Sequence, residues 1–382
     1  DRVLYHFGNS HFHQHMFDLL SIVPGVVVLH DFYLSAIQSY MSGIGVAPLN
    51  WKQHLYYSHG YMAVYTATHE SYPHEALWTY PTNLKVLQDA LGVIVHSENS
   101  KQLANQWYGN HTADKWHLIP HLRHLPAKNS KEDARESLGF ADDDFIICSF
   151  GIINKTKRSL ELVEAFIQSE LTKKDNTYLI LVGENDGGDY GKQITNTIRQ
   201  AKLQDRIQIT GWADTEDFRA YLQAADVGVQ LRTLSRGETS GTVLDCMNYG
   251  LATIVNANGS MAYLDKDSVM ILPDDFTQFE LQQALEKLYA SQELREKLGH
   301  NALQTIKAQH NPQRCAAMYY QAIESTYLQQ EQKLYGLLHY RLVDQQIDLN
   351  QDDQFNALAT NFPIQPKLKQ LFVDISELVQ RD

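Results

Sequence analysis

Two loops in the middle of the chain carry residue types that suit a diphosphate. The first loop contains Gly151, Lys157 and Arg158, between an apolar run at 145–150 and an amphipathic stretch that starts at 159. The N-terminus of a helix offers N–H groups and a partial positive charge, and cationic side chains add full charges. The loop is therefore predicted to bind phosphate, and the alternative interpretation is a basic loop on a solvated surface.

The second loop covers residues 232–241 and again joins an apolar run to an amphipathic stretch. Arg232 can hold a diphosphate through two parallel hydrogen bonds. Gly237 and Gly241 allow backbone angles that other residues avoid, and they let a ligand approach closely. This loop is predicted to be the second half of the same phosphate site.

Polar residues near the end of the second loop are predicted to belong to the same site. Thr239 and Ser240 can cap the next helix or donate hydrogen bonds to phosphate. Asp245 lies one turn into that helix, where its carboxylate can accept hydrogen bonds from ribose hydroxyls. The alternative interpretation is a well-capped helix with a salt bridge.

Histidines and aromatic residues in the first third of the chain give weaker signals. His30 follows an apolar run and can contact a sugar, or it can simply pair with Asp31. Tyrosines and tryptophans are frequent at 51–80, and we expect them to pack in a helical core rather than to bind carbohydrate. No group of residues has convincing metal-ligand spacing, so no metal is predicted.

Short apolar runs alternate with helical stretches along most of the chain, which is typical of parallel β/α units. The series breaks at a polar stretch near 126–137. We therefore predict two Rossmann-like, doubly wound domains that face a cleft, at 1–127 and 128–330, with ligands at the carboxyl ends of strands.

The composition excludes several classes of protein. The chain has 382 residues and a net charge of −13, which disfavours a nucleic-acid partner. Its three cysteines form no CxxC pair, and no apolar run reaches membrane-spanning length. The cysteines also show no disulfide framework, so we expect a reducing, cytoplasmic compartment.

The order of motifs resembles the donor domain of retaining glycosyltransferase family 4, which has the GT-B fold. Upstream motifs at 24–31, 95–97 and 119–120 resemble the acceptor domain of that family, so the resemblance covers about 9–330. The donor-domain motifs are Phe-Gly at 150–151, Lys-Arg at 157–158, Leu-Val-Gly-Glu at 181–184, Gly211, Ala-Asp-Val-Gly-Val at 225–229, Gly-Glu-Thr-Ser-Gly at 237–241, Asp245, Tyr-Gly-Leu-Ala-Thr-Ile-Val at 249–255 and Gly-Ser at 259–260.

The resemblance assigns roles to single residues. It implies that Lys157 binds phosphate, that His30 faces the donor sugar, and that Asp245 is the second acid of a Glu-x7-Glu motif and holds the ribose. The first acid of that motif falls on Gly237, so Glu238, one residue late, is the substitute. The arginine usual after the loop glycine is Ile152 here, and Arg232 takes its place.

The resemblance also implies the reaction. A sugar moves from a nucleotide-diphosphate donor to a hydroxyl of a glycan or lipid-linked glycan with retention, without a cofactor, in bacterial surface polysaccharide synthesis. This places the protein in the cytoplasm, with peripheral contact at the inner membrane. The alternatives are a non-catalytic carbohydrate-binding or scaffold module and a GT-B epimerase.

Both ends of the sequence look cut. The opening strand of the family, with its glycine-rich loop, is expected before residue 1, so the first domain is predicted to be truncated at its start. Residues 331–382 form a tail, and 371–379 resembles the opening strand of a further domain. The chain is thus expected to be a segment of a multi-domain glycosyltransferase.

Overall fold

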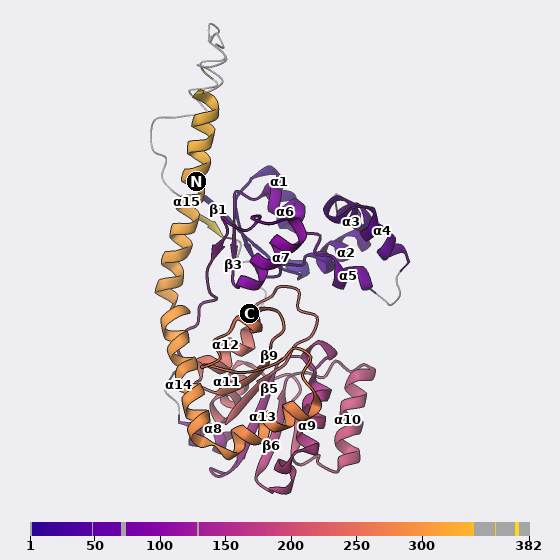
Figure 1. The fold of residues 1–382 in the computed structure, drawn as a ribbon, viewed down its shortest axis with the longest axis vertical. Helices are drawn as coiled ribbons and strands as arrows, with labels where there is room; N and C mark the ends of the chain where they lie inside the picture. The colour runs from indigo at the N-terminus through magenta and orange to yellow at the C-terminus, as the bar shows by residue number, and fades with distance from the viewer. Residues whose placement is uncertain are drawn as a thin grey trace. The chain divides into compact units, whose positions relative to one another are not determined.

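The computed structural model describes residues 2–47, 49–69, 74–127, 130–339, 356 and 371–373. The chain divides into two compact units, which Figure 1 shows along the colour gradient. The first unit is formed by residues 1–95, 103–119 and 316–382, and the second by residues 96–102 and 120–315.

The first unit is built on a parallel sheet with the strand order β11-β1-β2-β3-β4. The four residues of β2 are all apolar and all buried, as expected for a strand that is covered on both faces. The strands are β1 (Arg2–Phe7), β2 (Val26–Leu29), β3 (Gly92–Val95), β4 (His117–Leu118) and β11 (Leu371–Val373).

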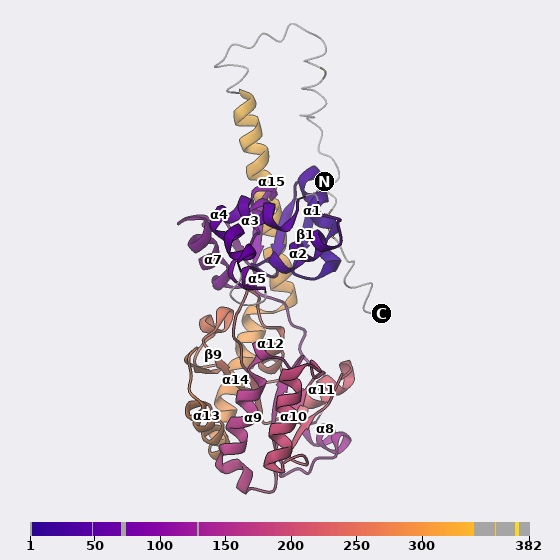
Figure 2. The ribbon, with the colours of Figure 1, turned by 90° about the vertical axis from the view of Figure 1, so that its right-hand side faces the viewer.

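Helices connect these strands, and two of them, α3 and α4, lie side by side away from the sheet (Figures 1 and 2). A capping box at Asn50 and Gln53 starts α3, and Gly60, with a φ of 73°, separates α3 from α4. The helical elements are η1 (His11–His13), α1 (His15–Ile22), α2 (Ser35–Gly43), α3 (Trp51–His59), α4 (Tyr61–Thr68), α5 (Glu75–Thr79), α6 (Leu84–Asp89) and α7 (Glu98–Tyr108).

The long helix α15 (Pro312–His339) packs against the first sheet. The backbone N–H of Val3 donates a hydrogen bond to the Tyr327 hydroxyl at 2.9 Å, and Arg2 forms an ion pair with Glu324 at 3.3 Å. Gly92 leaves room for Thr326, because a Cβ at residue 92 would lie 2.7 Å from the Thr326 Oγ1. These contacts hold this part of α15 against the first sheet.

The strand β11 adds to the edge of the same sheet. It runs parallel to β1, with Arg2 opposite Leu371 and Leu4 opposite Val373. The sequence analysis expects 371–379 to open a further domain. The three residues described here pair with the first sheet, and residues 374–379 lie outside the described part of the chain, as does most of the tail at 331–382.

The second unit holds a parallel sheet with the order β10-β9-β8-β5-β6-β7. Two parallel-sheet domains are thus present, and the predicted α/β fold class is confirmed. The strands are β5 (Phe145–Phe150), β6 (Thr177–Val182), β7 (Ile207–Ile209), β8 (Val227–Gln230), β9 (Ala252–Asn256) and β10 (Met270–Leu272).

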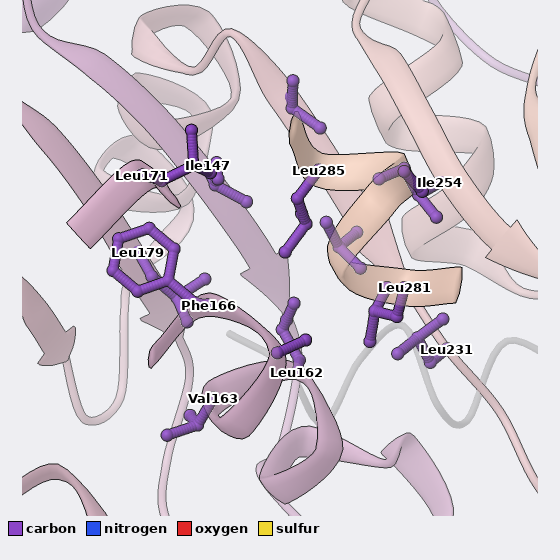
Figure 3. Packing of buried hydrophobic residues seen from close by; sticks show 14 of the residues in the cluster. Ile147, Leu162, Val163, Phe166, Leu171, Leu179, Leu231, Ile254, Leu281 and Leu285 are labelled. Carbon is purple, nitrogen blue, oxygen red and sulfur yellow. The ribbon is translucent and has the colours of Figure 1, made fainter. Parts of the chain in front are cut away.

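Helices cover both faces of the second sheet and close its core. On one face Leu162, Phe166 and Leu281 pack against the strand residues Ile147 and Leu179 (Figure 3). Full burial of one such side chain stabilises the fold by about 1.5–3 kcal/mol. The helical elements are α8 (Lys131–Leu138), η2 (Lys155–Lys157), α9 (Ser159–Gln168), η3 (Glu170–Lys173), α10 (Asp189–Ala201), α11 (Thr215–Ala224), α12 (Gly241–Asn248), η4 (Gly259–Tyr263), α13 (Gln278–Ala290) and α14 (Gln292–Gln309).

The strand order locates the point where ligands bind in folds of this type. From β5 the chain proceeds outward to β6 and β7, then returns to β8 on the other side of β5. The loops that follow β5 and β8 therefore diverge from neighbouring strands, and the crevice between them is the switch point of the sheet. Among the described residues, no helix is long and apolar enough to cross a bilayer.

Candidate functional site

The two predicted phosphate loops meet at this switch point. One follows β5 and the other follows β8, and the backbone N–H of Thr233 donates a hydrogen bond to the carbonyl of Thr156 at 2.9 Å. This bond ties the loops together across the sheet. The structure thus brings together two segments that lie about 80 residues apart in the sequence.

The loop after β5 is shaped around Gly151 and Lys157. Gly151 has a φ of 101°, and a Cβ at residue 151 would lie 2.8 Å from the Lys157 Nζ. Any larger residue at 151 would therefore displace the ammonium. Asn154 caps η2 by accepting a hydrogen bond from the Lys157 N–H at 3.2 Å, and the Lys157 Nζ donates to the carbonyl of Phe150 at 3.1 Å.

The ammonium of Lys157 is in an unfavourable electrostatic position. Burial lowers its pKa to about 7, and the positive charge of Arg232 contributes in the same direction, while Glu238 opposes the shift. A bound dianion would relieve both effects, because it would supply the missing counter-charge. Lys157 and Arg232 are thus two of the predicted donor residues that the fold does bring close to each other.

Arg158, the next residue, faces elsewhere. Its guanidinium lies 3.8 Å above the ring of Phe276, donates to the carbonyl of Asp274 at 3.1 Å and pairs with Glu161 at 3.3 Å. These contacts join α9 to the segment before α13. The positive charge of Arg158 is therefore already stabilised within the protein and does not require a phosphate.

In the loop after β8, two hydrogen bonds with the side chain of Asn256 fix the backbone of Arg232. Asn256, at the end of β9, accepts a hydrogen bond from the Arg232 N–H at 2.7 Å and donates one to the Arg232 carbonyl at 2.8 Å. Asn256 also donates to Asp274 at 2.8 Å. The sequence analysis did not select Asn256, although its place directly after an apolar strand is a signal that could have found it.

Glu238 forms a turn with its own neighbours. Its carboxylate accepts hydrogen bonds from the Arg236 N–H at 2.7 Å and the Ser235 hydroxyl at 3.2 Å, and it lies 3.8 Å from Arg232. Gly237, with a φ of 83°, makes this turn possible. The carboxylate is thus held next to Arg232 at the switch point rather than on the first turn of α12.

The predicted capping residues do not act as side-chain caps. Ser240 occupies the N-cap position of α12, but its hydroxyl makes no capping hydrogen bond within the described chain; it lies 3.2 Å from the Thr242 hydroxyl instead. Thr239 is half-buried beside it. The N–H groups that open α12 at Gly241 therefore receive no side-chain cap from Ser240, which keeps the helix N-terminus suited to an anion.

Asp245 is paired with a residue that the sequence analysis did not select. Its carboxylate lies 2.8 Å from the Arg123 Nε, and Arg123 also donates to the carbonyl of Gly241 at 2.9 Å. Burial raises the pKa of Asp245, and Arg123 acts in the opposite direction. Because 122 residues separate the partners, no local pattern indicates this pair.

Asp245 also lines a cavity of about 1270 Å³ in the second unit. Its wall includes residues of α8, α11 and α12, the segment 122–127, and Trp212, whose side chain is 79% exposed. The cavity is large enough for a nucleoside, and it offers an acid for ribose hydroxyls and an indole for a base.

His30 belongs to the first unit, at the end of β2. Its Nε2 lies 2.9 Å from the Nδ1 of His6 on β1, and the two rings are stacked with centroids 5.1 Å apart. Asp31, the partner considered from the sequence, instead accepts a hydrogen bond from the Asn9 N–H at 2.8 Å. His30 thus contacts a histidine of the neighbouring strand β1.

Comparisons with known proteins agree with this architecture. Sucrose-phosphate synthase from Thermosynechococcus elongatus is 18% identical, with a TM-score of 0.59 over 83% of this chain and 77% of that one. HepE of Anabaena, solved with UDP, is 15% identical, with a TM-score of 0.58 over 85% and 99%. WaaG, a glycosyltransferase involved in lipopolysaccharide biosynthesis, is 14% identical, with a TM-score of 0.54 over 84% of each chain.

No curated protein sequence matches this chain significantly. Residues 130–305, which hold both loops and the cavity-lining helices α8, α11 and α12, match the family model of the glycosyl transferases group 1. The chain has the two-domain α/β architecture of its GT-B neighbours, and the match to the group 1 family model falls on the unit that contains the second sheet.

Proposed function

We propose that this chain transfers a sugar from a nucleotide-diphosphate sugar to a hydroxyl of a glycan or lipid-linked glycan, with retention at the anomeric carbon. The observation that carries the proposal is the approach of two cations at the switch point. Lys157 and Arg232 come from different loops, which the hydrogen bond from the Thr233 N–H to the Thr156 carbonyl at 2.9 Å holds together, and the positive charge of Arg232 contributes to the lowered pKa of Lys157. Two like charges held together in a parallel α/β sheet are arranged for a diphosphate.

In the proposed reaction the bond between the anomeric carbon and the diphosphate oxygen breaks, and the acceptor oxygen bonds to that carbon from the same face. The acceptor proton leaves with the diphosphate or passes to solvent. Lys157, Arg232 and the N-terminus of α12 stabilise the negative charge that develops on the diphosphate. Glu238 and His30 are assigned to the donor sugar, and Asp245 to the ribose.

Support for the donor class comes from the fold neighbours, since HepE has been solved with UDP-glucose. The cavity beside Asp245 gives the nucleoside a place in the same unit as the cations. A role in bacterial surface polysaccharide synthesis, in the cytoplasm or at the inner face of its membrane, extends the proposal. It rests on the likeness to proteins such as WaaG and on the motifs in the sequence.

The proposal is tested by incubating the protein with UDP-, GDP- and ADP-sugars, first for thermal stabilisation and then for turnover. We expect one nucleotide class to raise the Tm and its sugar to be transferred or slowly hydrolysed, in the presence of EDTA as in its absence. Product NMR then shows whether the anomeric configuration is retained. Stabilisation without turnover would favour a non-catalytic module, and conversion of the free nucleotide sugar to its epimer would favour an epimerase.

A further inference from the structure

Two pairs of aromatic rings lie on the surface of the first unit, on the helix pair α3 and α4. We name this group the tyrosine strip and define it as Tyr56, Tyr61, Tyr65 and His69. The rings of Tyr56 and Tyr61 are 4.7 Å apart, and those of Tyr65 and His69 are stacked at 4.4 Å. Tyr61 and Tyr65 are four residues apart on α4, which places them on one face.

The strip faces outward because the core of the helix pair uses other residues. Leu55, Ala63 and Ala76 form this small core and are fully buried. Tyr61 is 77% exposed, Tyr65 58% and Tyr56 51%. The expectation that the aromatic residues at 51–80 pack in a helical core is therefore wrong for these three tyrosines.

The hydroxyl groups of the three tyrosines make no hydrogen bond within the part of the chain that the structure describes. Tyr57, by contrast, donates to Gln88 at 2.5 Å on another side of α3. The strip thus combines open ring faces with hydroxyls that remain available to a ligand. A purely structural cluster would bury the rings.

The charge around the strip is also distinctive. The helices α3 and α4 contain no Asp or Glu, although the chain as a whole has 45 acidic residues and a net charge of −13. Glu70 follows directly after His69 in the sequence, and Glu75 opens α5. Lys52, His54 and His59 are the basic groups of the two helices, so no carboxylate of α3 or α4 repels an anionic ligand at the strip.

We infer that the tyrosine strip is a binding platform for an extended glycan, which packs its pyranose rings on the aromatic faces. The C–H groups on one face of a pyranose carry partial positive charge, and an aromatic face is negative, so the two attract. The tyrosine hydroxyls add hydrogen bonds to sugar hydroxyls. In the context of the proposed transferase, on which this part of the inference rests, the glycan is the acceptor chain.

The composition of the strip favours a glycan over a membrane surface. Helices that bind at a bilayer interface combine large apolar side chains such as Trp, Phe and Leu with many Lys and Arg residues. Neither α3 nor α4 has an exposed Trp, Phe or Leu, and Lys52 is their one Lys or Arg. Their exposed residues are Lys52, Gln53, Tyr56, Tyr57, Tyr61, Met62, Tyr65 and Thr68.

The test uses the full chain and saturation-transfer NMR with maltohexaose and a hyaluronan hexasaccharide. We expect at least one hexasaccharide to bind, and each ring removed by Tyr61→Ala or Tyr65→Ala to weaken binding about two- to tenfold. Tyr61→Phe should keep most of the affinity because the ring remains. Tyr57→Ala is the matched control on α3 and should bind as the wild type does.

Binding of neither hexasaccharide, or equal binding by the wild type and the double variant Tyr61→Ala/Tyr65→Ala, would overturn the inference. Strip-dependent sedimentation with phosphatidylglycerol vesicles in the absence of glycan binding would overturn it in favour of a membrane contact. Stabilisation by UDP-, GDP- and ADP-sugars is measured in parallel. Failure of all three classes alone contradicts the proposed transferase, whereas loss of glycan binding alone contradicts the platform.

Discussion

The loop after β5 and the loop after β8 lie at the same edge of the second sheet, but their cationic side chains have different partners. Lys157 in the first loop donates to a backbone carbonyl, and burial and a nearby cation lower its pKa. In the second loop Arg232 has Glu238 within 3.8 Å. The first loop is therefore incomplete without an anion, whereas the second is partly balanced and positions its charges.

The same contrast separates two adjacent residues. Within the described part of the chain Lys157 forms no ion pair with a carboxylate, while Arg158 contacts Glu161, a backbone carbonyl and an aromatic ring. Charge alone does not distinguish a ligand-binding residue from a structural one. The distinction depends on whether the fold already provides the counter-charge.

The largest effect is expected for Lys157→Ala. Loss of a charge-assisted contact to the diphosphate should lower kcat/KM for the donor about tenfold to a hundredfold. Arg158→Ala is the matched control, because it removes the neighbouring cation. It should cost about 1 kcal/mol of unfolding free energy through the lost contact with Phe276, with little change in turnover. Equal losses of kcat/KM in both variants would contradict the assignment of Lys157 to the diphosphate and of Arg158 to the fold.

Glu238→Gln should lower turnover about tenfold, since it removes the charge beside Arg232 and the donor sugar. The amide oxygen can still accept from Arg236, so the unfolding free energy should fall by at most about 1 kcal/mol. Glu161→Gln changes an acid that also pairs with an arginine and serves as control. Full activity of the Glu238 variant would assign its carboxylate to loop structure alone.

The pH dependence of donor affinity tests whether the pKa of Lys157 is lowered. With a pKa of about 7 in the unbound protein, Lys157 loses its proton as the pH rises, and a bound diphosphate raises that pKa. Binding should therefore take up a proton above about pH 7, and affinity should fall by at most about tenfold per pH unit.

UDP-glucose is the suitable ligand for this measurement, because its diphosphate diester carries no titrating proton in that range. Calorimetry in two buffers with different ionisation enthalpies counts the protons taken up. Lys157→Arg keeps a positive charge at every pH in the range and should show a flat profile. A wild-type affinity that does not change between pH 6.5 and 8.5 would contradict the lowered pKa.

Part of this site can be predicted from the sequence alone. Local patterns predict β5, β8 and the loops after them, because buried parallel strands are short and mostly apolar. Gly151 follows β5 directly, and the loop after β8 contains Gly237. They do not predict that Arg158 lies over Phe276 or that Arg123 meets Asp245, since these partners are brought together only by tertiary packing. The sequence also fails to predict that the tyrosines of α4 are exposed. The pattern of one short helix does not show which of its faces a neighbouring element covers.

The smallest effect is expected for the pair of Arg123 and Asp245, and it decides whether Asp245 is a ligand-binding or a structural acid. Asp245→Asn keeps an oxygen that can accept from ribose, so donor affinity should weaken only about threefold. Arg123→Ala leaves the carboxylate in place without its 2.8 Å partner, so it should lower stability by about 1 kcal/mol and change donor affinity less. In a double-mutant cycle the two changes should be coupled in unfolding free energy, because the two side chains contact each other. Donor affinity that is insensitive to Asp245→Asn, together with strong coupling in stability, would show that the pair only fastens the segment 122–127 to α12.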